Sequence, residues 1–164
     1  MLIPFAELLG RSCFSFLEGA SHPNEMVEKS HELGHTALAI ADRDGLYGSV
    51  RAHTSGKMQG QRVITGAELT LEDDAGSPLH PGSVVLLARD LQGYGNLCAL
   101  LTLAHAEHEK GTAGITVAQV AAASSGLTAI VPLEARRDPE APLDAVLGPL
   151  RDAFNERLFV ATWR

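Results

Sequence analysis

Short apolar runs alternate with helical stretches along this chain, and that alternation limits the folds it can adopt. Two segments show it: FAELLGRSCFSFLEGASHPNEMV at Phe5–Val27 and ALAIADRDGLYG at Ala37–Gly48. In each, an apolar run ends in a polar loop that leads into a helix. α/β folds keep their chemistry at the mouths of such strands. The residues that this layout places there are Leu9, Arg11, Glu18, Asp42 and Arg43.

Periodicity and capping residues predict the order β-α-β-α-β(β-hairpin)-α-α-β-α-β, which is typical of an α/β fold with a mostly parallel sheet. Ser21 and His22 offer an N-cap, Pro23 suits the first turn of the next helix, and Gly34 closes that helix. The predicted strands after it are Thr36–Ala41, Gln61–Thr65, Ala67–Glu72, Val84–Arg89, Leu127–Val131 and Arg157–Thr162. The predicted helices are Leu46–Met58, Gln92–Glu109, one capped by Thr116 that runs to Ala123, and Leu143–Phe154. A hairpin loop is predicted at Asp73–Ser83 and a linker-like loop at Pro132–Pro142.

Length and composition fit one soluble domain over residues 1–164, with 45% hydrophobic and 20% charged residues. The chain stops at Trp163–Arg164, just past a strand and without a covering helix, which predicts a domain truncated at its C-terminus. Its apolar runs are too short to span a bilayer. The N-terminal MLIPFAELLG lacks the basic region of a signal peptide, so we expect a cytoplasmic protein.

The formal net charge of −7 bears on possible partners. A surface that binds nucleic acid normally carries a basic patch, and the densest basic stretch here is the pair Arg136–Arg137. We therefore expect no direct binding of nucleic acid. In a nucleic-acid process, another segment or partner would hold the nucleic acid.

The segment ELLGRSCFSFLEGASHPNEMVEKSHELGHTALAIADRDGLYGSVRAH, at Glu7–His53, resembles the N-terminus of the PHP domain of bacterial C-family DNA polymerases. These are the replicative DNA polymerase III alpha subunit and its error-prone relatives. FSFLEGASHP at Phe14–Pro23 is more similar to the error-prone branch. Further matches are ITGAEL at Ile64–Leu69 and VLLARDLQGYGNLCALLTLA at Val85–Ala104. The resemblance covers essentially the whole chain and weakens after about Thr116.

The resemblance implies part of a distorted (β/α)7 barrel whose strand ends hold two or three metal ions in a cluster of His, Asp and Glu. Zinc and manganese take imidazole and carboxylate ligands, and paired metals activate water against a phosphoester. The family's His-x-His pair falls on Leu9 and Arg11 of this chain. Its Asp-His pair falls on Asp42 and Arg43, so that carboxylate is kept and that imidazole is lost. The metal-ligand positions that keep an oxygen donor are Asp42, Glu68 and, as a replacement, Glu18.

Leucine cannot bind a metal, and arginine stays protonated and repels a cation. Arginine–carboxylate pairs are charge-assisted and often bidentate, so Arg11 and Arg43 could neutralise the remaining carboxylates and keep the shape of the pocket. We therefore hypothesise a vestigial metal site rebuilt as a salt-bridge cluster. No cofactor is expected; zinc or manganese is the alternative.

Simpler interpretations remain open for these residues. Without the resemblance, Asp42 would be a helix N-cap in a DRDG turn, and Glu68 a solvated charge at the start of a hairpin. His105 and His108 stand three apart on one helix, a spacing that can chelate a metal, although exposed helical histidines are much commoner.

A nucleophile or oxyanion site is another possibility at the first loop. Arg11 lies next to Ser12 and Cys13, but no partner base is evident in the sequence around them. Cys13 and Cys98 lie far apart and form no CxxC pair, which argues against a disulfide framework or a zinc knuckle. We therefore expect no catalytic residue here.

Three functions follow. The first is a structural and interaction module, without chemistry of its own, from the PHP region of an error-prone DNA polymerase III alpha-type subunit. Its partners would be the polymerase core of the same or parent subunit and other replication and repair proteins, and an exposed sheet edge would favour self-association. The second is a metal-dependent phosphoesterase or proofreading 3'-5' exonuclease. The third is a free-standing α/β domain of unrelated function.

Overall fold

The computed structural model describes residues 4–133 and 143–162, along which strands and helices alternate as in an α/β fold. The elements of its first half are β1 (Ala6–Gly10), α1 (Pro23–Glu32), β2 (Ala37–Arg43), α2 (Ser49–Gln59), β3 (Val63–Glu72) and β4 (Pro78–Ala88). Those of its second half are α3 (Leu91–Ala106), β5 (Ile115–Thr116), α4 (Val117–Ala122), β6 (Leu127–Leu133), α5 (Asp144–Phe154), a short 3-10 helix (Asn155–Arg157) and β7 (Leu158–Thr162). The predicted α/β class is confirmed.

The chain divides into two compact units, Met1–Ala67 and Glu68–Arg164. Strand β3 contains the boundary between them. In the first unit the strand order is β1-β2-β3, and in the second it is β3-β4-β6-β7, with β5 beside β3.

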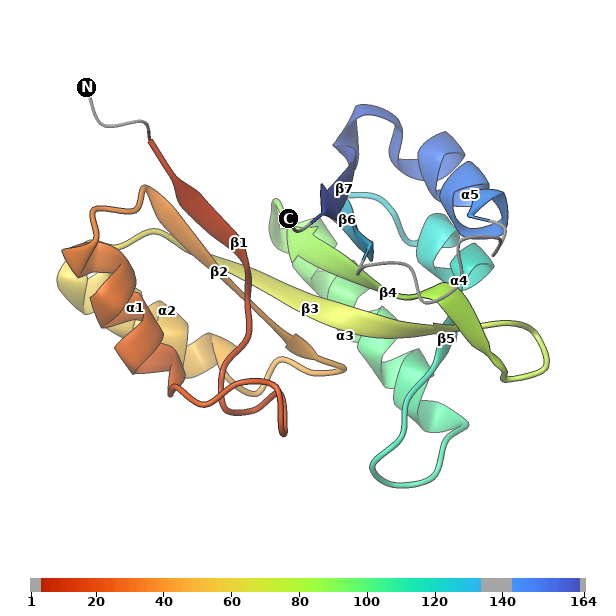
Figure 1. Ribbon diagram of the computed structural model, residues 1–164, viewed down its shortest axis with the longest axis horizontal. Helices are drawn as coiled ribbons and strands as arrows, with labels where there is room; N and C mark the ends of the chain where they lie inside the picture. The colour runs from red at the N-terminus through yellow and green to blue at the C-terminus, as the bar shows by residue number, and fades with distance from the viewer. Residues whose placement is uncertain (1–3, 134–142, 163–164) are drawn as a thin grey trace. The chain divides into compact units, whose positions relative to one another are not determined.

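Parallel strands and two helices form the first unit. Strand β1 runs parallel to β2 with Ala6 opposite Ala37, and the register shifts before Gly10, which lies opposite Ile40. Helices α1 and α2 lie side by side (Figure 1). The hydrophobic core consists of Val27 from α1, Leu38 and Ile40 from β2, and Ala52 from α2, with Met26 and Val63 packed against it.

Helix α1 begins and ends where the capping residues predict. His22 is the N-cap in an extended conformation, and Pro23 occupies the first turn, where its missing N–H costs nothing. The carboxylate of Glu25 accepts a hydrogen bond from the backbone N–H of His22 at 2.8 Å. Gly34 follows the C-terminus with a φ of 71°, a left-handed conformation that glycine adopts without strain. The predicted helix is confirmed.

The second unit combines both strand directions. Strand β4 is antiparallel to β6, whereas β6 runs parallel to β7 and β3 parallel to β5. Helix α3 contacts β4 and β6, and α4 contacts α5. The largest fully buried side chains of this unit include Leu86, Leu97, Ile115, Leu127, Leu150 and Phe154.

Strand β3 corrects one prediction. The sequence suggested two strands, Gln61–Thr65 and Ala67–Glu72, interrupted at Gly66, but the structure forms the single strand Val63–Glu72. Gly66 and the three residues after it are buried, so the strand is covered on both faces at this point. A glycine inside a strand weakens it without ending it when both faces are packed.

The predicted hairpin loop Asp73–Ser83 is too long, because β4 already begins at Pro78. Asp73 closes the shorter turn: its Oδ1 accepts hydrogen bonds from the N–H groups of Ala75 at 2.9 Å and Ser77 at 2.8 Å. Proline is tolerated at the first position of a strand, where no ladder hydrogen bond is required of it. The hairpin itself is confirmed.

Smaller differences concern element ends. Strand β5, only two residues long, was not predicted. Strand β6 continues to Leu133 through Pro132, which the sequence assigned to a linker, and Pro132 lies opposite Ala161 of β7. The rest of that linker, residues 134–142, and Trp163–Arg164 lie outside the described residues.

Two helices are shorter than predicted. Helix α2 begins at Ser49 instead of Leu46, and α3 ends at Ala106 instead of Glu109. Helix α3 has a clear start, because the Oδ1 atom of its N-cap, Asp90, accepts a hydrogen bond from the Gly93 N–H at 2.8 Å. Element types are thus predicted more reliably than their ends.

Candidate functional site

Asp42 lies near the end of β2 and is buried, with 1% of its surface exposed. Its carboxylate accepts three hydrogen bonds from the loop that follows β1. The Ser12 N–H donates to Oδ1 at 2.7 Å, the Ser12 hydroxyl to Oδ2 at 2.8 Å, and the Ser15 hydroxyl to Oδ1 at 2.8 Å. A buried carboxylate needs such donors, because burial without them is costly.

The helix-cap interpretation of Asp42 is wrong. The N-cap of α2 is Gly48, six residues further along, and Asp42 belongs to a strand. Gly48 nevertheless lies against the carboxylate: a Cβ added there would be 2.8 Å from Asp42 Oδ2 and 3.2 Å from Ser12 Oγ. The absence of a side chain at Gly48 therefore lets the start of α2 approach Asp42.

Ser12 and Ser15 are part of this site although the sequence analysis gave neither a role with Asp42. Both serines are buried, and the hydroxyl oxygen of each also accepts a hydrogen bond from a backbone N–H group. The Phe14 N–H donates to Ser12 Oγ at 3.3 Å, and the Arg43 N–H donates to Ser15 Oγ at 3.1 Å. Two serines in a polar loop are an ordinary pattern, and no local signal links them to a residue about 30 positions away.

Glu18 contacts both Arg11 and Arg43. Arg11 Nη1 lies 2.8 Å from Glu18 Oε2, and Arg43 Nη1 lies 2.7 Å from Glu18 Oε1. The side chains of Arg11 and Glu18 are 28% and 27% exposed, and that of Arg43 is 46% exposed. The two arginines thus contact separate oxygens of Glu18, and Arg43 Nε also lies 3.8 Å from Asp44 Oδ2.

The backbone beside these charges adopts unusual conformations. Leu17, which precedes Glu18, has a φ of 65°, and Asp44, which follows Arg43, has a φ of 47°. Residues with a Cβ seldom occupy this region, and for leucine the cost is about 1 kcal/mol or more. Backbone strain of this kind often clusters at functional sites.

Leu9 occupies β1 and is half-buried. Its backbone N–H donates to Glu7 Oε1 at 2.8 Å. An aliphatic side chain at this position offers no donor atom to a metal ion.

Glu68 belongs to the second unit and is also buried, with 3% of its surface exposed. It accepts a hydrogen bond from the Ser83 hydroxyl at 2.6 Å, across the β3–β4 hairpin. Its interpretation as a solvated charge is therefore wrong.

The side chains around Asp42 are poor ligands for a metal ion. Arg11 and Arg43 carry permanent positive charges, and Leu9 has no donor atom. Within residues 4–133 and 143–162, no three His, Cys, Asp or Glu side chains are grouped so that they could hold a metal ion.

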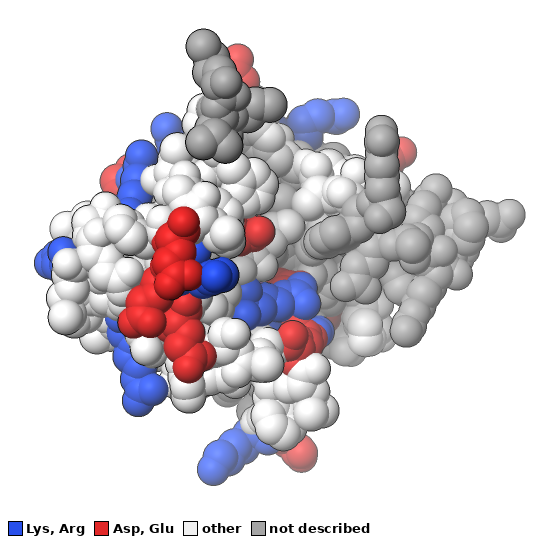
Figure 2. All heavy atoms as spheres, turned by 60° about the vertical axis from the view of Figure 1, so that its left-hand side comes forward, with Lys and Arg blue, Asp and Glu red and all other residues white. Residues whose placement is uncertain are grey.

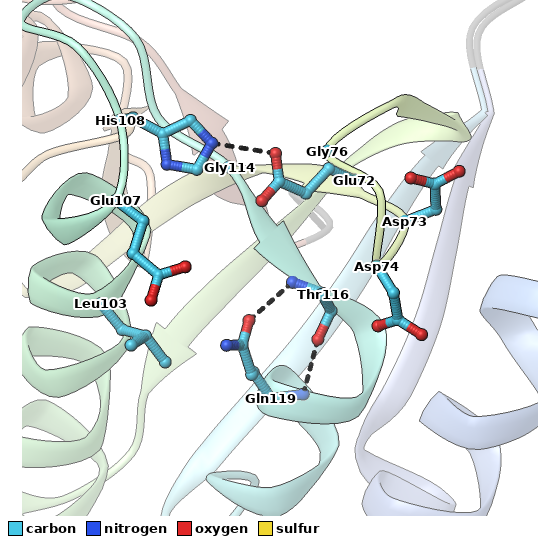
Figure 3. Close-up of a pocket in the computed structure, with 10 residues that line it drawn as sticks. All are labelled: Glu72, Asp73, Asp74, Gly76, Leu103, Glu107, His108, Gly114, Thr116 and Gln119. Atoms are coloured by element: carbon cyan, nitrogen blue, oxygen red, sulfur yellow. Dashed lines mark hydrogen bonds and ion pairs between the residues drawn. The ribbon is translucent and has the colours of Figure 1, made fainter.

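A separate pocket of the second unit involves His108 (Figure 3). His108 Nε2 lies 3.0 Å from Glu72 Oε2, and the cavity beside them has a volume of about 370 Å³. His105 is not among its lining residues, so the pocket does not bring the two histidines of the predicted i, i+3 pair together. The residues that line it are Glu72, Asp73, Asp74, Gly76, Leu103, Glu107, His108, Gly114, Thr116 and Gln119.

The sequence analysis also predicted that the surface has no basic patch for binding nucleic acid. On the face drawn in Figure 2, the blue Lys and Arg groups are separated by red and white ones, so the described part of that face has no continuous basic area. In the part of the chain that the structure describes, no helix combines the length and the apolar character needed to cross a membrane.

Comparison with known proteins identifies the family. The PHP domain model matches residues 8–158. The chain is 45% identical to the error-prone DNA polymerase of Anaeromyxobacter dehalogenans, over 98% of this chain and 14% of that protein. It is 35% identical to the error-prone DNA polymerase of Bdellovibrio bacteriovorus, over 98% of this chain and 15% of that protein. The chain thus spans about a seventh of the length of these relatives.

Solved structures support the same fold. A protein of Bifidobacterium adolescentis named for metal-dependent phosphoesterase activity aligns with a TM-score of 0.61 and 16% identity, over 89% of this chain and 74% of that one. An amidohydrolase of Chromobacterium violaceum aligns with a TM-score of 0.53 and 13% identity, over 77% and 66%. Likeness at this identity concerns the fold. Together with the sequence matches, it shows that the chain belongs to the PHP domain family and is homologous to the PHP region of error-prone DNA polymerases.

Proposed function

We propose that this chain is a structural and interaction module of an error-prone DNA polymerase III alpha-type subunit, with a degenerate metal site and no chemistry of its own. DNA synthesis would belong to the polymerase segment of the parent protein, a DNA-directed DNA polymerase in DNA replication and repair. We further propose a cytoplasmic location.

The observation that carries this proposal is the contact of Glu18 with both Arg11 and Arg43. The resemblance to the family implies that its metal-binding members have histidines at these two positions. Their imidazoles would bind a metal ion. Here two guanidinium groups bring the positive charge instead. Asp42, the carboxylate kept beside them, is already held by three donors from Ser12 and Ser15. The module would therefore keep the loops of the PHP entrance in place without a metal.

The partners proposed for the module are proteins: the polymerase core of the same or parent subunit and other replication and repair proteins. The net charge of −7 supports this choice over direct contact with nucleic acid, because phosphate backbones are bound by basic surfaces. We also propose self-association through an exposed sheet edge, which gel filtration tests.

Metal content tests the proposal. The purified chain is dialysed against zinc or manganese, then against metal-free buffer, and bound metal is measured by elemental analysis. We expect well below about 0.1 metal ion per chain, because arginine and leucine replace ligands that metal binding requires. About one or more transition-metal ions per chain, lost on Asp42→Ala, would overturn it.

The alternative is a metal-dependent phosphoesterase or proofreading 3'-5' exonuclease. The retained carboxylates Asp42 and Glu68 support it. The test is hydrolysis of a phosphate monoester and of a 3'-ended oligonucleotide with manganese, comparing the unchanged chain with Glu68→Gln. We expect the same background rate for both proteins. An activity that Glu68→Gln abolishes would reverse the order of the two proposals.

A further inference from the structure

Cys13 and His22 form a pair that the sequence analysis did not foresee. The Cys13 Sγ atom lies 3.2 Å from His22 Nδ1, although the residues are nine positions apart. The sequence contains no obvious base near Cys13; the turn of residues 13–21 brings one to it.

Backbone hydrogen bonds hold both members of the pair in place. The Cys13 N–H donates to the Ser21 carbonyl oxygen at 2.8 Å, which closes the loop beside the start of α1. The His22 N–H donates to Glu25 Oε2 at 2.8 Å, and Pro23 restricts the backbone that follows. The backbone of both residues is therefore held in place, which keeps the thiol and the imidazole near each other.

Both side chains are also accessible from solvent. Cys13 is partly exposed, and His22 is exposed at the N-cap of α1. A thiol within hydrogen-bond reach of an imidazole can transfer its proton to that ring, and the thiolate is the nucleophilic form of cysteine. The N-terminal end of a helix of ten residues adds a favourable field for a negative sulfur.

Cys98 provides an internal comparison. It is partly exposed like Cys13, but lies within α3, four residues after Tyr94. The neighbouring Cys98 thiol is the main cause that raises the pKa of Tyr94 above its ordinary value of 10.0. The Tyr94 phenol is therefore protonated at neutral pH and cannot take a proton from the Cys98 thiol.

We propose that Cys13 is a modification site, a thiol nucleophile served by His22 as base, and that it undergoes thiol–disulfide exchange with small-molecule disulfides. The Cys13 thiol passes its proton to His22 Nδ1, and the sulfur then attacks one sulfur atom of the disulfide. The disulfide bond breaks as a new S–S bond to Cys13 forms, and the other half leaves as a thiolate. Cys13 is oxidised to a mixed disulfide, and the leaving half is reduced.

The test measures the rate of exchange with 5,5'-dithiobis(2-nitrobenzoate) at neutral pH, followed by the absorbance of the released thiolate. Cys98→Ser leaves only Cys13 to react, and Cys13→Ser leaves only Cys98. We expect Cys13 to react at least about tenfold faster than Cys98, because a positioned base accelerates proton transfer by this much or more. A Cys13 rate equal to or below that of Cys98 would overturn the proposal without any change at His22.

Substitution of the base gives the second measurement. In the Cys98→Ser background, His22→Gln is expected to slow the reaction of Cys13 roughly tenfold. The matched control is His31→Gln, which removes an exposed histidine about 13 Å along the same helix and should leave the rate unchanged. His22→Asn, which keeps a good N-cap residue, serves as a second version of the substitution.

The reaction is repeated in concentrated urea to show whether the effect of His22 on the Cys13 rate requires the folded protein. There the His22→Gln and His31→Gln proteins should react at the same rate, because the contact between Cys13 and His22 is lost. Equal rates of these two proteins in the folded state would refute the role of His22. Oxidised glutathione as a second probe, with the adduct located by mass spectrometry, should mark Cys13, and an adduct confined to Cys98 would contradict the assignment.

Discussion

Ser12 and Asp42 are joined by two hydrogen bonds, one from the Ser12 N–H to Oδ1 at 2.7 Å and one from its hydroxyl to Oδ2 at 2.8 Å. Both oxygens of a buried carboxylate are thus engaged by one residue of the neighbouring loop. The pairing connects the loop after β1 to the end of β2 through the amide and hydroxyl groups of Ser12.

Removal of the Asp42 carboxylate should destabilise the protein strongly. Asp42→Ala leaves the buried donors of Ser12 and Ser15 without their acceptor, and we expect a loss of about 2–4 kcal/mol in the free energy of unfolding. Urea unfolding followed by circular dichroism measures it. Asp152→Asn, at a side chain that is 80% exposed, should change stability by less than about 0.5 kcal/mol. Similar small effects for both would contradict the role given to Asp42.

Ser15 and Asp42 should be energetically coupled. Ser15→Ala removes the hydroxyl that donates to Asp42 Oδ1 at 2.8 Å, at an expected cost of about 1–2 kcal/mol. In the double variant with Asp42→Ala, the loss should be smaller than the sum of the single losses by about 1 kcal/mol, because the two residues share one interaction. The four unfolding free energies of this cycle give the coupling, and strict additivity would argue against it.

The bridge between Arg11, Glu18 and Arg43 should contribute modestly and depend on salt. These side chains are partly exposed, so Glu18→Gln is expected to cost about 1 kcal/mol at low ionic strength. The difference should fall by about half or more in 1 M sodium chloride, where exposed charges are screened. Unfolding at both salt concentrations measures it.

The control for Glu18 is Glu32→Gln, which breaks the exposed pair of Glu32 with Lys29 at 2.9 Å. An i, i+3 pair on a helix surface is worth about 0.2–0.5 kcal/mol. A Glu18→Gln effect no larger than that of Glu32→Gln would show that the bridge is an ordinary surface ion pair.

In the second unit, Ser83 should matter through Glu68. Ser83→Ala withdraws a donor at 2.6 Å from a carboxylate that is 3% exposed, and we expect a loss of about 2 kcal/mol. Ser77→Ala, at an exposed residue of the same hairpin, should stay within about 0.5 kcal/mol of the unchanged protein. Thermal or urea unfolding measures the stability of both variants. Equal stabilities of Ser83→Ala and Ser77→Ala would contradict this prediction.

Two glycines of α3 should respond in opposite directions to alanine. A Cβ at Gly93 would overlap the carbonyl group of Gly126, so Gly93→Ala should cost about 2–3 kcal/mol. Gly95 has nothing within 4 Å of such a Cβ, so Gly95→Ala should stabilise the helix by about 0.5–1 kcal/mol. Melting temperatures that shift in the same direction would disprove the assignment of the close approach.

Local sequence signals were enough to predict most elements of the fold. The ends of α1 follow from His22, Pro23 and Gly34, which act through the backbone of their immediate neighbours. Helix α4 begins after Thr116, whose hydroxyl accepts a hydrogen bond from the Gln119 N–H at 3.3 Å. The choice between helix and strand was readable because periodicity and capping operate within one or two turns.

Distant pairings could not be read in this way. The sequence analysis predicted two strands where β3 is continuous through Gly66. It also missed β5, because a strand of two residues exists only through its partner, here Leu71 and Glu72 of β3. Burial on both faces, which keeps β3 whole, is likewise a property of the packed sheet.

The sequence by itself determined the residue types: Leu9, Arg11 and Arg43, and the carboxylates Asp42, Glu68 and Glu18. Only the tertiary structure decided their partners. It turned Asp42 toward two serines, placed Glu18 between the arginines and brought His22 to Cys13. The chemistry of a side chain follows from the residue type alone. Hydrogen bonds between residues 7 to 30 positions apart depend instead on how the loops fold against the strands.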